Sequence, residues 1–297
     1  VIDRRETARL MTAARAPLFT AVLIGGSLIL LINFALRASF GVFQIPIAQE
    51  FGWPRAEFSL AIAIQNLAWG IGQPIFGALA ERWGDRWSII IGAFLYSAGL
   101  ILTAFATDPL TVQLLEVMVG FGIAGTGFGV ILAVIGRAAS DENRSLALGI
   151  GTAAGSAGQV FGAPLAEALL AHYPWQSVFI IFGVIVLACL FFLPMLGGSK
   201  PASRHELEES MGSVLRRAFT DPSYLMIFAG FFSCGYQLAF ITAHFPAMIT
   251  EMCGTPDPNG MLAGIGITTT SILGAISISL IGVANIAGTI FAGWLGK

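Results

Sequence analysis

The sequence predicts an all-α protein that crosses a lipid membrane several times. Of its 297 residues, 56% are hydrophobic and 11% are charged, and the mean hydropathy is +0.82. A soluble domain usually carries about 25% charged residues, which cover its surface. The apolar residues also fall into eight separate runs. Because a helix of about 20 apolar residues crosses the hydrocarbon core, lipid is the solvent that this composition fits.

The eight predicted spans are rich in Gly, Ala, Ser and Thr. Small residues let helices in a membrane pack closely against one another. A soluble core helix is a poor alternative, because glycine costs up to about 1 kcal/mol per residue there. The spans cover residues 18–47, 57–80, 87–106, 110–136, 146–171, 175–196, 223–250 and 274–295.

Basic residues are distributed unevenly between the two sides of the predicted membrane. If the N-terminus is cytoplasmic, thirteen Lys and Arg residues lie on the cytoplasmic side and one, Arg55, lies on the other. Cytoplasmic loops of membrane proteins are enriched in this way. We therefore expect a cytoplasmic N-terminus. The short loops, and the preference for Arg over Lys, favour a bacterial inner membrane.

The longest polar stretch, residues 197–222, separates six spans from two. We predict an N-terminal six-helix transmembrane bundle over residues 1–196, a cytoplasmic linker over 197–222 and the first two helices of a second bundle over 223–297. Residues 204–219 of the linker have the apolar spacing of a surface helix. The chain begins with Val1 and stops directly after an apolar run. We therefore expect a truncated second bundle, and a chain that is inactive alone.

A short internal repeat supports two related halves. Gly72 and Gly77 lie near the end of the second span, and Gly288 and Gly293 lie near the end of the eighth with the same spacing. Transporters built from two parallel repeats retain such similarity.

The turn after the second span carries the most specific motif, Gly77-Ala-Leu-Ala-Glu81-Arg82-Trp-Gly84-Asp85-Arg86. It resembles the signature of the major facilitator superfamily, which reads Gly, three residues, Asp, Arg, any residue, Gly and then basic residues. Here Glu81 replaces the usual Asp, and Asp85 stands where a basic residue is common. Residues 37–53 and 143–155 further resemble the bacterial branch of the monocarboxylate-transporter-like families. Animal members of that family carry a charged pair in the eighth helix, which residues 274–295 lack.

This resemblance implies the major facilitator fold, in which two six-helix bundles rock around a central site. It implies a secondary transporter of small organic anions, such as monocarboxylates, that is coupled to protons or to another solute. Two alternatives stay open at this stage. One is an exporter of apolar or cationic compounds, and the other is a non-transporting membrane sensor or scaffold on the same fold.

Arg37 is the first candidate for binding the substrate, because an ionisable side chain inside a span costs roughly 2.5–3.5 kcal/mol and is a functional candidate by default. Asn33 lies four residues before it and Gln44 seven after, which places all three on one helical face. A guanidinium there would bind a carboxylate with two hydrogen bonds. The alternatives are that Arg37 reaches to the outer interface or packs helices through a salt bridge.

Further candidates lie in the fourth and seventh spans. In the related fold the first and fourth helices line the cavity, so we hypothesise that Arg37 and Glu116 form a pair that substrate or a proton disrupts. The alternative for Glu116 is a carboxylate that contacts water at the interface. Gln237 and His244 share a polar face of the seventh span, and His244 is suited to substrate binding or proton coupling. The alternative is a histidine that is merely hydrogen-bonded.

The charges predicted at the cytoplasmic ends of the second to fifth spans have a different expected role. In the related family such charges hold the outward-open state, and by resemblance we pair Glu81 with Arg137. We expect Gly77 to allow close helix contact. Alternatively, the arginines only set the topology. The predicted gating residues are Gly77, Glu81, Arg82, Gly84, Asp85, Arg86, Arg137, Asp141 and Arg144.

Several classes of function are disfavoured. The chain shows no metal-ligand spacing, no nucleophile with a base and no phosphate-binding loop, so we predict no enzyme, no cofactor and no metal. Three cysteines form no disulfide framework. A net charge of −2 gives no sign of the basic surface that binds nucleic acid. The expected partners are a small-molecule substrate, protons and the lipid bilayer, and we expect a monomer.

Overall fold

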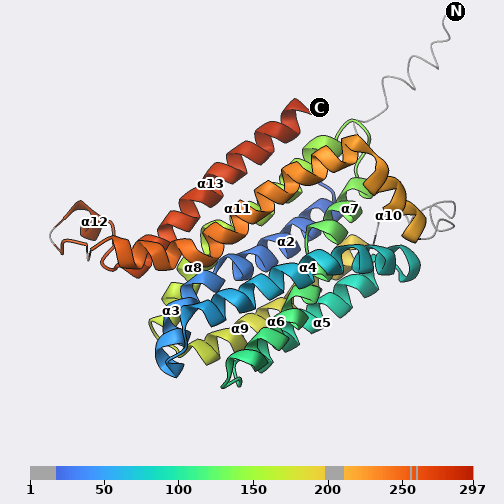
Figure 1. Ribbon diagram of the computed structural model, residues 1–297. Helices are drawn as coiled ribbons and strands as arrows, with labels where there is room; N and C mark the ends of the chain where they lie inside the picture. Colours follow the sequence, from blue (N-terminus) through green and yellow to red (C-terminus); the bar gives the residue numbers. More distant parts are fainter. Residues whose placement is uncertain (1–17, 198–210, 255, 259, 297) are drawn as a thin grey trace, which may run out of the picture.

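The computed structural model describes residues 18–197, 211–254, 256–258 and 260–296, and these residues form helices joined by short connections (Figure 1). All eight predicted spans are helical. Five of them are unbroken, namely α4 (Arg55–Trp83), α5 (Asp85–Thr103), α8 (Arg144–Leu170), α11 (Pro222–Met252) and α13 (Thr270–Leu295).

The other three spans each divide into two helical segments. The first consists of α2 (Ala21–Ala38) and α3 (Phe40–Phe51), the fourth of α6 (Pro109–Thr126) and α7 (Phe128–Ala138), and the sixth of α9 (Trp175–Ala188) and the 3-10 helix η1 (Cys189–Leu196). The break in the fourth span is at Gly127, whose backbone is extended with φ −94° and ψ −162°.

Local sequence explains where the helices begin. The side chains of Thr20, Asp108 and Thr269 each accept a hydrogen bond from a backbone N–H in the first turn of the following helix, at 2.9–3.2 Å. These are the residues that cap helix N-termini best. Asp221 caps α11 in a similar way, and prolines at the first helical position add to the start of α6 and α11.

Six helical segments of the described chain are long and apolar enough to cross a membrane. The predicted spans α4 and α8 are not among them. Amide side chains such as Gln65, Asn66 and Gln73 lower the hydropathy of α4, and glycines, Ser156 and Gln159 lower that of α8. Both helices nevertheless run beside the apolar ones, α4 against α6 and α8 against α2 and α13. The chain is therefore an all-helical, multi-spanning membrane protein.

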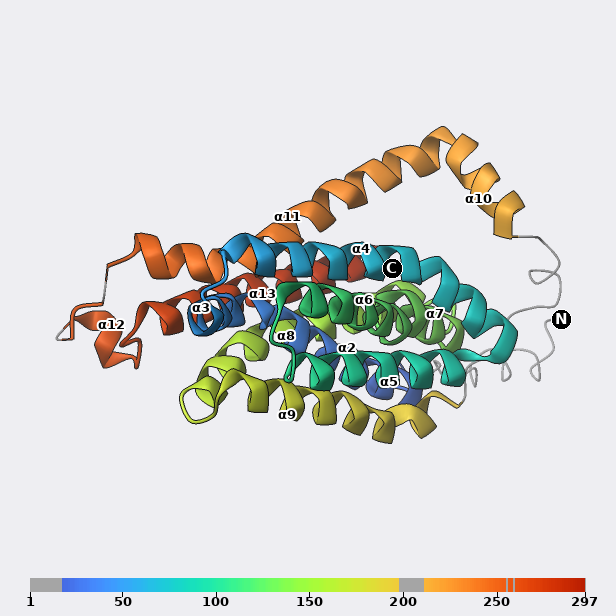
Figure 2. The same cartoon turned by 60° about the horizontal axis from the view of Figure 1, so that its bottom comes forward.

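The helices run between two ends of the molecule, which we call the linker end and the far end (Figure 2). The linker end carries the α4–α5 turn and α10 (Met211–Thr220), which is the described part of the predicted surface helix 204–219. The far end carries the last turns of α3 and α8 and the short helix α12 (Met261–Gly264). Residues 198–210 of the predicted linker lie outside the described residues, and the division into domains stays a prediction.

The apolar core lies mostly within the first six spans and reaches α11 and α13 through Ala243, Ala275 and Ile278. One cluster of buried residues, including Phe43, Tyr96 and Phe179, fills the spans toward the far end, and a second, including Ile29 and Ile131, fills them toward the linker end. Many large apolar side chains are exposed as well, such as Phe191 at 83%. In a soluble monomer an apolar surface of this extent would be unusual, whereas in a membrane it faces lipid.

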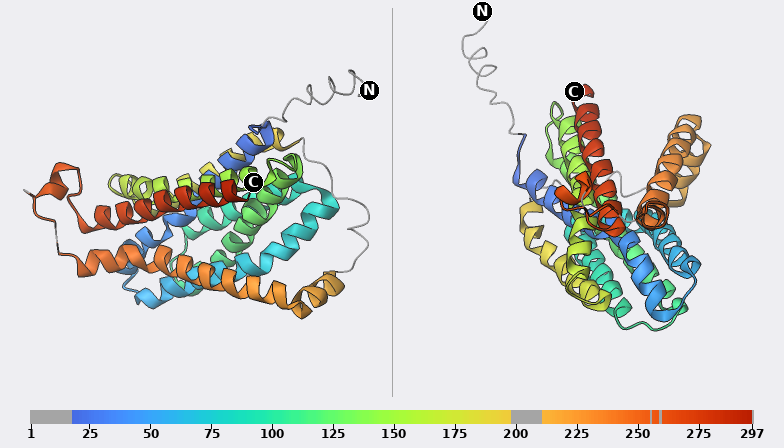
Figure 3. Two further views of the ribbon diagram at one scale, coloured as in Figure 1. Left: turned by 90° about the horizontal axis from the view of Figure 1, so that it is seen from above. Right: turned by 90° about the vertical axis from the view of Figure 1, so that its left-hand side faces the viewer.

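Helices α11 and α13 join this core in different ways. Helix α13 packs along α8, whereas α11 contacts α3 and α13 through its second half. Toward the linker end α11 diverges from α4, so that α10 and the first turns of α11 stand away from the other helices (Figures 2 and 3). Residues 222–237 of α11 are all exposed.

Candidate functional site

Arg37 lies in the last turn of α2, and its side chain is buried in the protein. Its Nη2 donates a hydrogen bond of 2.8 Å to Oδ1 of Asn66 on α4. The guanidinium also lies over the ring of Trp69, at 4.7 Å from its centroid, one turn further along α4. A cation over an indole face is attracted by the ring. Arg37 therefore points into the bundle, and the alternative that it reaches to the interface is wrong.

No carboxylate of the described residues forms an ion pair with Arg37. Its Nε, although buried, has no hydrogen-bond partner among them. Burying a charge without a partner is costly. A buried arginine in this state can donate hydrogen bonds to two oxygens of an anion.

A small cavity of about 10 Å³ lies beside Arg37, which is close to the space of one water molecule. Helices α2, α3, α4 and α11 contribute its walls, so it lies where the first six spans meet α11. Its lining consists of Arg37, Phe40, Ile62, Gln65, Asn66, Thr242 and Ala243.

Glu116 is buried on α6 and is held by the residue next to Asn66. Nε2 of Gln65 donates to its Oε2 at 2.6 Å. The predicted pair of Arg37 and Glu116 is therefore not formed in this structure. Two adjacent amides of α4 bind the two side chains separately. The alternative of an interfacial carboxylate is wrong as well, because Glu116 is only 2% exposed.

Asn33 and Gln44 share the buried side of the first span with Arg37 but bind elsewhere. Asn33 donates to the carbonyl of Ile29 and accepts from the hydroxyl of Thr126 at 3.1 Å, which ties α2 to α6. Nε2 of Gln44 donates to the hydroxyl of Ser59 at 2.9 Å. The break between α2 and α3 at Ser39 contributes to this separation, since Gln44 belongs to α3.

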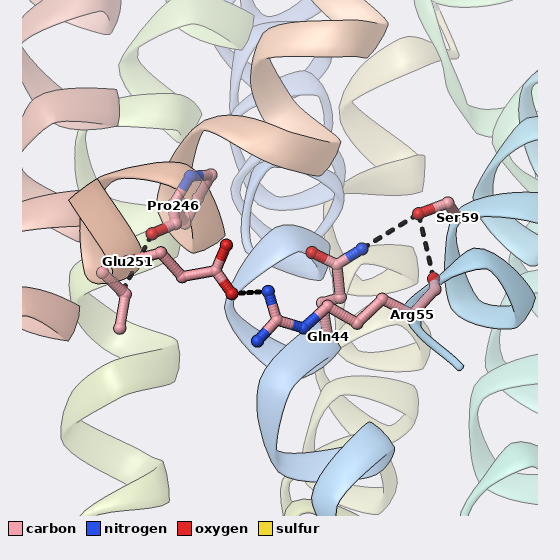
Figure 4. A network of polar contacts seen from close by, with 6 residues as sticks. Gln44, Arg55, Ser59, Pro246 and Glu251 are labelled. Atoms are coloured by element: carbon pink, nitrogen blue, oxygen red, sulfur yellow. Dashed lines mark hydrogen bonds and ion pairs between the residues drawn. The ribbon is translucent and has the colours of Figure 1, made fainter. Parts of the chain in front are cut away.

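Gln44 belongs to a polar network at the far end (Figure 4). Beside it, Arg55 at the start of α4 forms an ion pair with Glu251 near the end of α11. The two side chains are each 47% exposed. This pair connects the first six spans to α11 at the far end.

The seventh span presents different residues to Arg37 from those predicted. Gln237 is exposed, and His244 packs its ring against Phe240 at 5.2 Å between centroids. Neither lines the cavity beside Arg37. Thr242 and Ala243 do so instead, and Thr242 is one of the buried polar residues of the described chain.

The charges at the linker end form two ion pairs in the described chain. Nη2 of Arg137 lies 2.6 Å from Oδ1 of Asp85 at the start of α5, and Arg144 lies 3.0 Å from Asp141. The predicted pairing of Glu81 with Arg137 is therefore wrong in this structure. Glu81, Arg82 and Arg86 are exposed. Asp85 is the first residue of α5 and lies across the turn from Glu81, which is near the end of α4.

The two glycines of the motif have different roles. Gly84 has a φ of 95°, which only glycine adopts easily, and it makes the turn between α4 and α5 possible. Gly77 was expected to allow close helix contact, but a Cβ placed there would meet no atom within 4 Å. Among the four glycines of the repeat, Gly72 of α4 and Gly293 of α13 make close contacts with a neighbouring helix. These two do not correspond to each other, because Gly72 matches Gly288 and Gly77 matches Gly293. The expectation for Gly77 is wrong.

The candidate site also contains residues that the predicted set omits, namely Trp69 and Thr242. Trp69 follows the amide pair Gln65–Asn66 by one helical turn, so the sequence held a signal for it. Thr242 carried none, because a threonine in a span usually bonds to its own helix, as this hydroxyl does to the carbonyl of Leu238 at 2.6 Å.

The sequence profile described as "Major Facilitator Superfamily" matches residues 26–297. An uncharacterized MFS-type transporter, YcxA of Bacillus subtilis (strain 168), is 28% identical over 78% of this chain and 58% of its own length. Monocarboxylate transporter 13 of Bos taurus is 28% identical over 89% of this chain and 58% of its own length. The chain thus spans 58% of the length of both relatives.

The fold also resembles a solved structure, that of a bacterial homologue of the human lysosomal transporter Spinster. The TM-score is 0.52 at 16% identity, over 92% of this chain and 74% of the other. Both relatives are named as transporters and not as enzymes.

Proposed function

The chain belongs to the Major Facilitator Superfamily, and we propose that it acts as a secondary transporter that moves a small organic anion, such as a monocarboxylate, across the membrane by alternating access. Because the chain spans 58% of the length of these relatives, the proposed activity is that of a full-length transporter. The linker end is then the cytoplasmic side of a bacterial inner membrane, and the cytoplasmic N-terminus follows from the distribution of basic residues.

The observation that carries this proposal is the buried Arg37, which has no ion pair among the described residues and lies beside a cavity. A carboxylate ligand would supply the missing counter-charge and accept from the free Nε of Arg37. The cavity lies between the first six spans and α11, where transporters of related design bind their substrates. Its small volume fits a site that widens when α11 separates from the first six spans.

Glu116 is the proposed coupling group. It is buried, it has one hydrogen bond from Gln65, and Gln65 is adjacent to the Asn66 that binds Arg37. A proton or another cation arriving at Glu116 changes the charge near Gln65. Since Gln65 and Asn66 both line the cavity, the amide pair connects the coupling group with the anion site.

Anion binding is tested through the tryptophan that lies under Arg37. We expect lactate or pyruvate to change the fluorescence of the purified protein saturably, and Trp69→Phe to abolish that change. Arg37→Gln removes a charge-assisted hydrogen-bond donor, a loss of roughly 1.5–3 kcal/mol, so the affinity should fall about tenfold to a hundredfold. The matched control is Arg216→Gln on the exposed side of α10, which should bind as the unmodified protein does.

Uptake into proteoliposomes, with and without an inward proton gradient, then tests transport. Uptake that requires Arg37 and loses its dependence on the gradient in Glu116→Gln supports the proposal. If a folded Arg37→Gln variant still transports anions normally, the anion site is elsewhere. If the protein takes up no anion but moves apolar or cationic compounds, the exporter alternative holds.

A further inference from the structure

A second, larger cavity lies at the far end of the molecule and is separate from the Arg37 site. Helices α3, α8, α13 and α11 contact one another in a ring and form its walls. Its volume is about 630 Å³, which falls within the range of sites that bind small molecules. It shares no lining residue with the cavity beside Arg37.

The contact of α3 with α11 separates the two cavities. Gly41 of α3 lines the far-end cavity, and a Cβ on it would collide with the carbonyl oxygen of Thr242, which lines the other. The helix backbones thus touch at Gly41, and no side chain has room between them. The far-end cavity is therefore a compartment of its own in this structure.

The wall of this cavity is apolar except at a few positions. Side chains such as Val42, Ile45 and Ile272 make up most of it. The hydroxyl of Thr250 donates to the carbonyl of Pro246 at 2.9 Å, and that of Thr269 caps α13. These two hydroxyls are thus used within their own helices.

Glu167 of α8 is the charged residue of this wall, since the lining found in the described chain includes no Lys, Arg or His. It is half-buried, and its carboxylate has no hydrogen bond or ion pair to the described residues. It also lies in the last turn of α8, where the helix dipole disfavours a negative charge. Helix stability therefore does not explain an acidic residue at this position.

We propose that the far-end cavity binds an organic monocation with an apolar body, whose charge is balanced by Glu167. Charge complementarity selects the sign of the ligand, because a carboxylate without a cationic partner attracts a cation into an apolar site. The apolar wall and the volume select a compact, largely hydrophobic body. The site goes beyond the proposed anion transport and does not depend on it.

Tetraphenylphosphonium and tetraphenylborate test this proposal, because they match in shape and differ in the sign of their charge. Binding of labelled tetraphenylphosphonium to the purified protein is measured at pH 8, where a carboxyl group is ionised. We expect saturable binding that excess unlabelled cation displaces and tetraphenylborate does not. Glu167→Gln should weaken the binding at least tenfold.

Three further variants make the result specific. Glu142→Gln removes an exposed carboxylate at the linker end and should leave the binding unchanged. Ala168→Phe fills the cavity without changing its charge and should weaken binding, so the proposal does not rest on one variant. Arg37→Gln should retain cation binding even if it loses anion binding, which separates this site from the proposed function.

Equal binding of the cation by Glu167→Gln, in a protein whose melting temperature is unchanged, overturns the proposal. Equal displacement by tetraphenylborate overturns it as well, because the cavity would then bind an apolar body of either charge.

Discussion

Helix α13 packs against α8 over residues 279–296, whereas α11 is buried only in its second half, toward the far end (Figure 2). The α8–α13 contact is made by backbone. A Cβ on Gly149 would lie 3.0 Å from the Cα of Gly293, and the hydroxyls of Ser145 and Ser279 each donate to a carbonyl of the other helix. Close approach through small residues is how helices associate in a membrane.

The first half of α11 has none of these features. Its glycines, Gly230 and Gly235, have no atom near a Cβ placed on them, and large side chains such as Met226 and Phe231 are exposed. What holds α11 is concentrated at the far end, where Gly41 contacts Thr242, Gly274 contacts Pro246, and Arg55 pairs with Glu251. The difference is that α11 is packed toward the far end and exposed toward the linker end.

The largest expected effect on the free energy of unfolding comes from replacing a glycine by leucine, which we compare in α8 and in α11. Gly149→Leu overpacks the α8–α13 contact and should lower the free energy of unfolding by about 1–3 kcal/mol. Gly230→Leu enters open space in α11 and should be neutral or slightly stabilising, since leucine favours a helix over glycine by about 1 kcal/mol at most. Unfolding in mixed micelles measures both. Equal losses would contradict the contrast between the two helices.

A smaller effect is expected from the polar contact within the α8–α13 seam. Nδ2 of Asn285 donates to Oε1 of the buried Gln159 at 3.2 Å. Hydrogen bonds between membrane helices contribute about 0.6 kcal/mol on average, so a double-mutant cycle of Asn285→Leu and Gln159→Leu should give a coupling energy of that size. Gln237→Leu, on the exposed face of α11, is the control and should not couple to Gln159→Leu.

The smallest effect is expected from the ion pair that holds α11 at the far end. Arg55 and Glu251 are half-exposed, and such pairs contribute about 0.2–1 kcal/mol. Glu251→Gln should therefore raise the reactivity of a cysteine introduced at Thr250, inside the far-end cavity, by a few-fold at most. Exchanging the charges in Arg55→Glu/Glu251→Arg should restore the original rate. A rate that is unchanged in every variant would show that the pair does not hold the far end closed.

Much of the fold follows from local sequence. Runs of apolar residues predicted each of the eight helices, and the motif around Gly84 predicted both the family and the turn between α4 and α5. The sequence placed Arg37 inside a span, and its side chain is buried in the protein. It placed Glu81 and Arg82 at the end of a span, and both side chains are exposed. The expected ligand, coupling partner and oligomeric state remain proposals.

The sequence by itself determined where helices form, because helix formation and the preference for lipid depend on residues that are neighbours in the chain. The tertiary structure decided which side chains meet: Arg137 with Asp85 and not Glu81, Arg37 with Asn66 and not Glu116, Thr242 and not His244 beside the cavity. One residue along a helix turns a side chain by about 100°. Such choices therefore depend on how each helix is rotated against its neighbours, and that rotation is set by packing between residues far apart in the sequence.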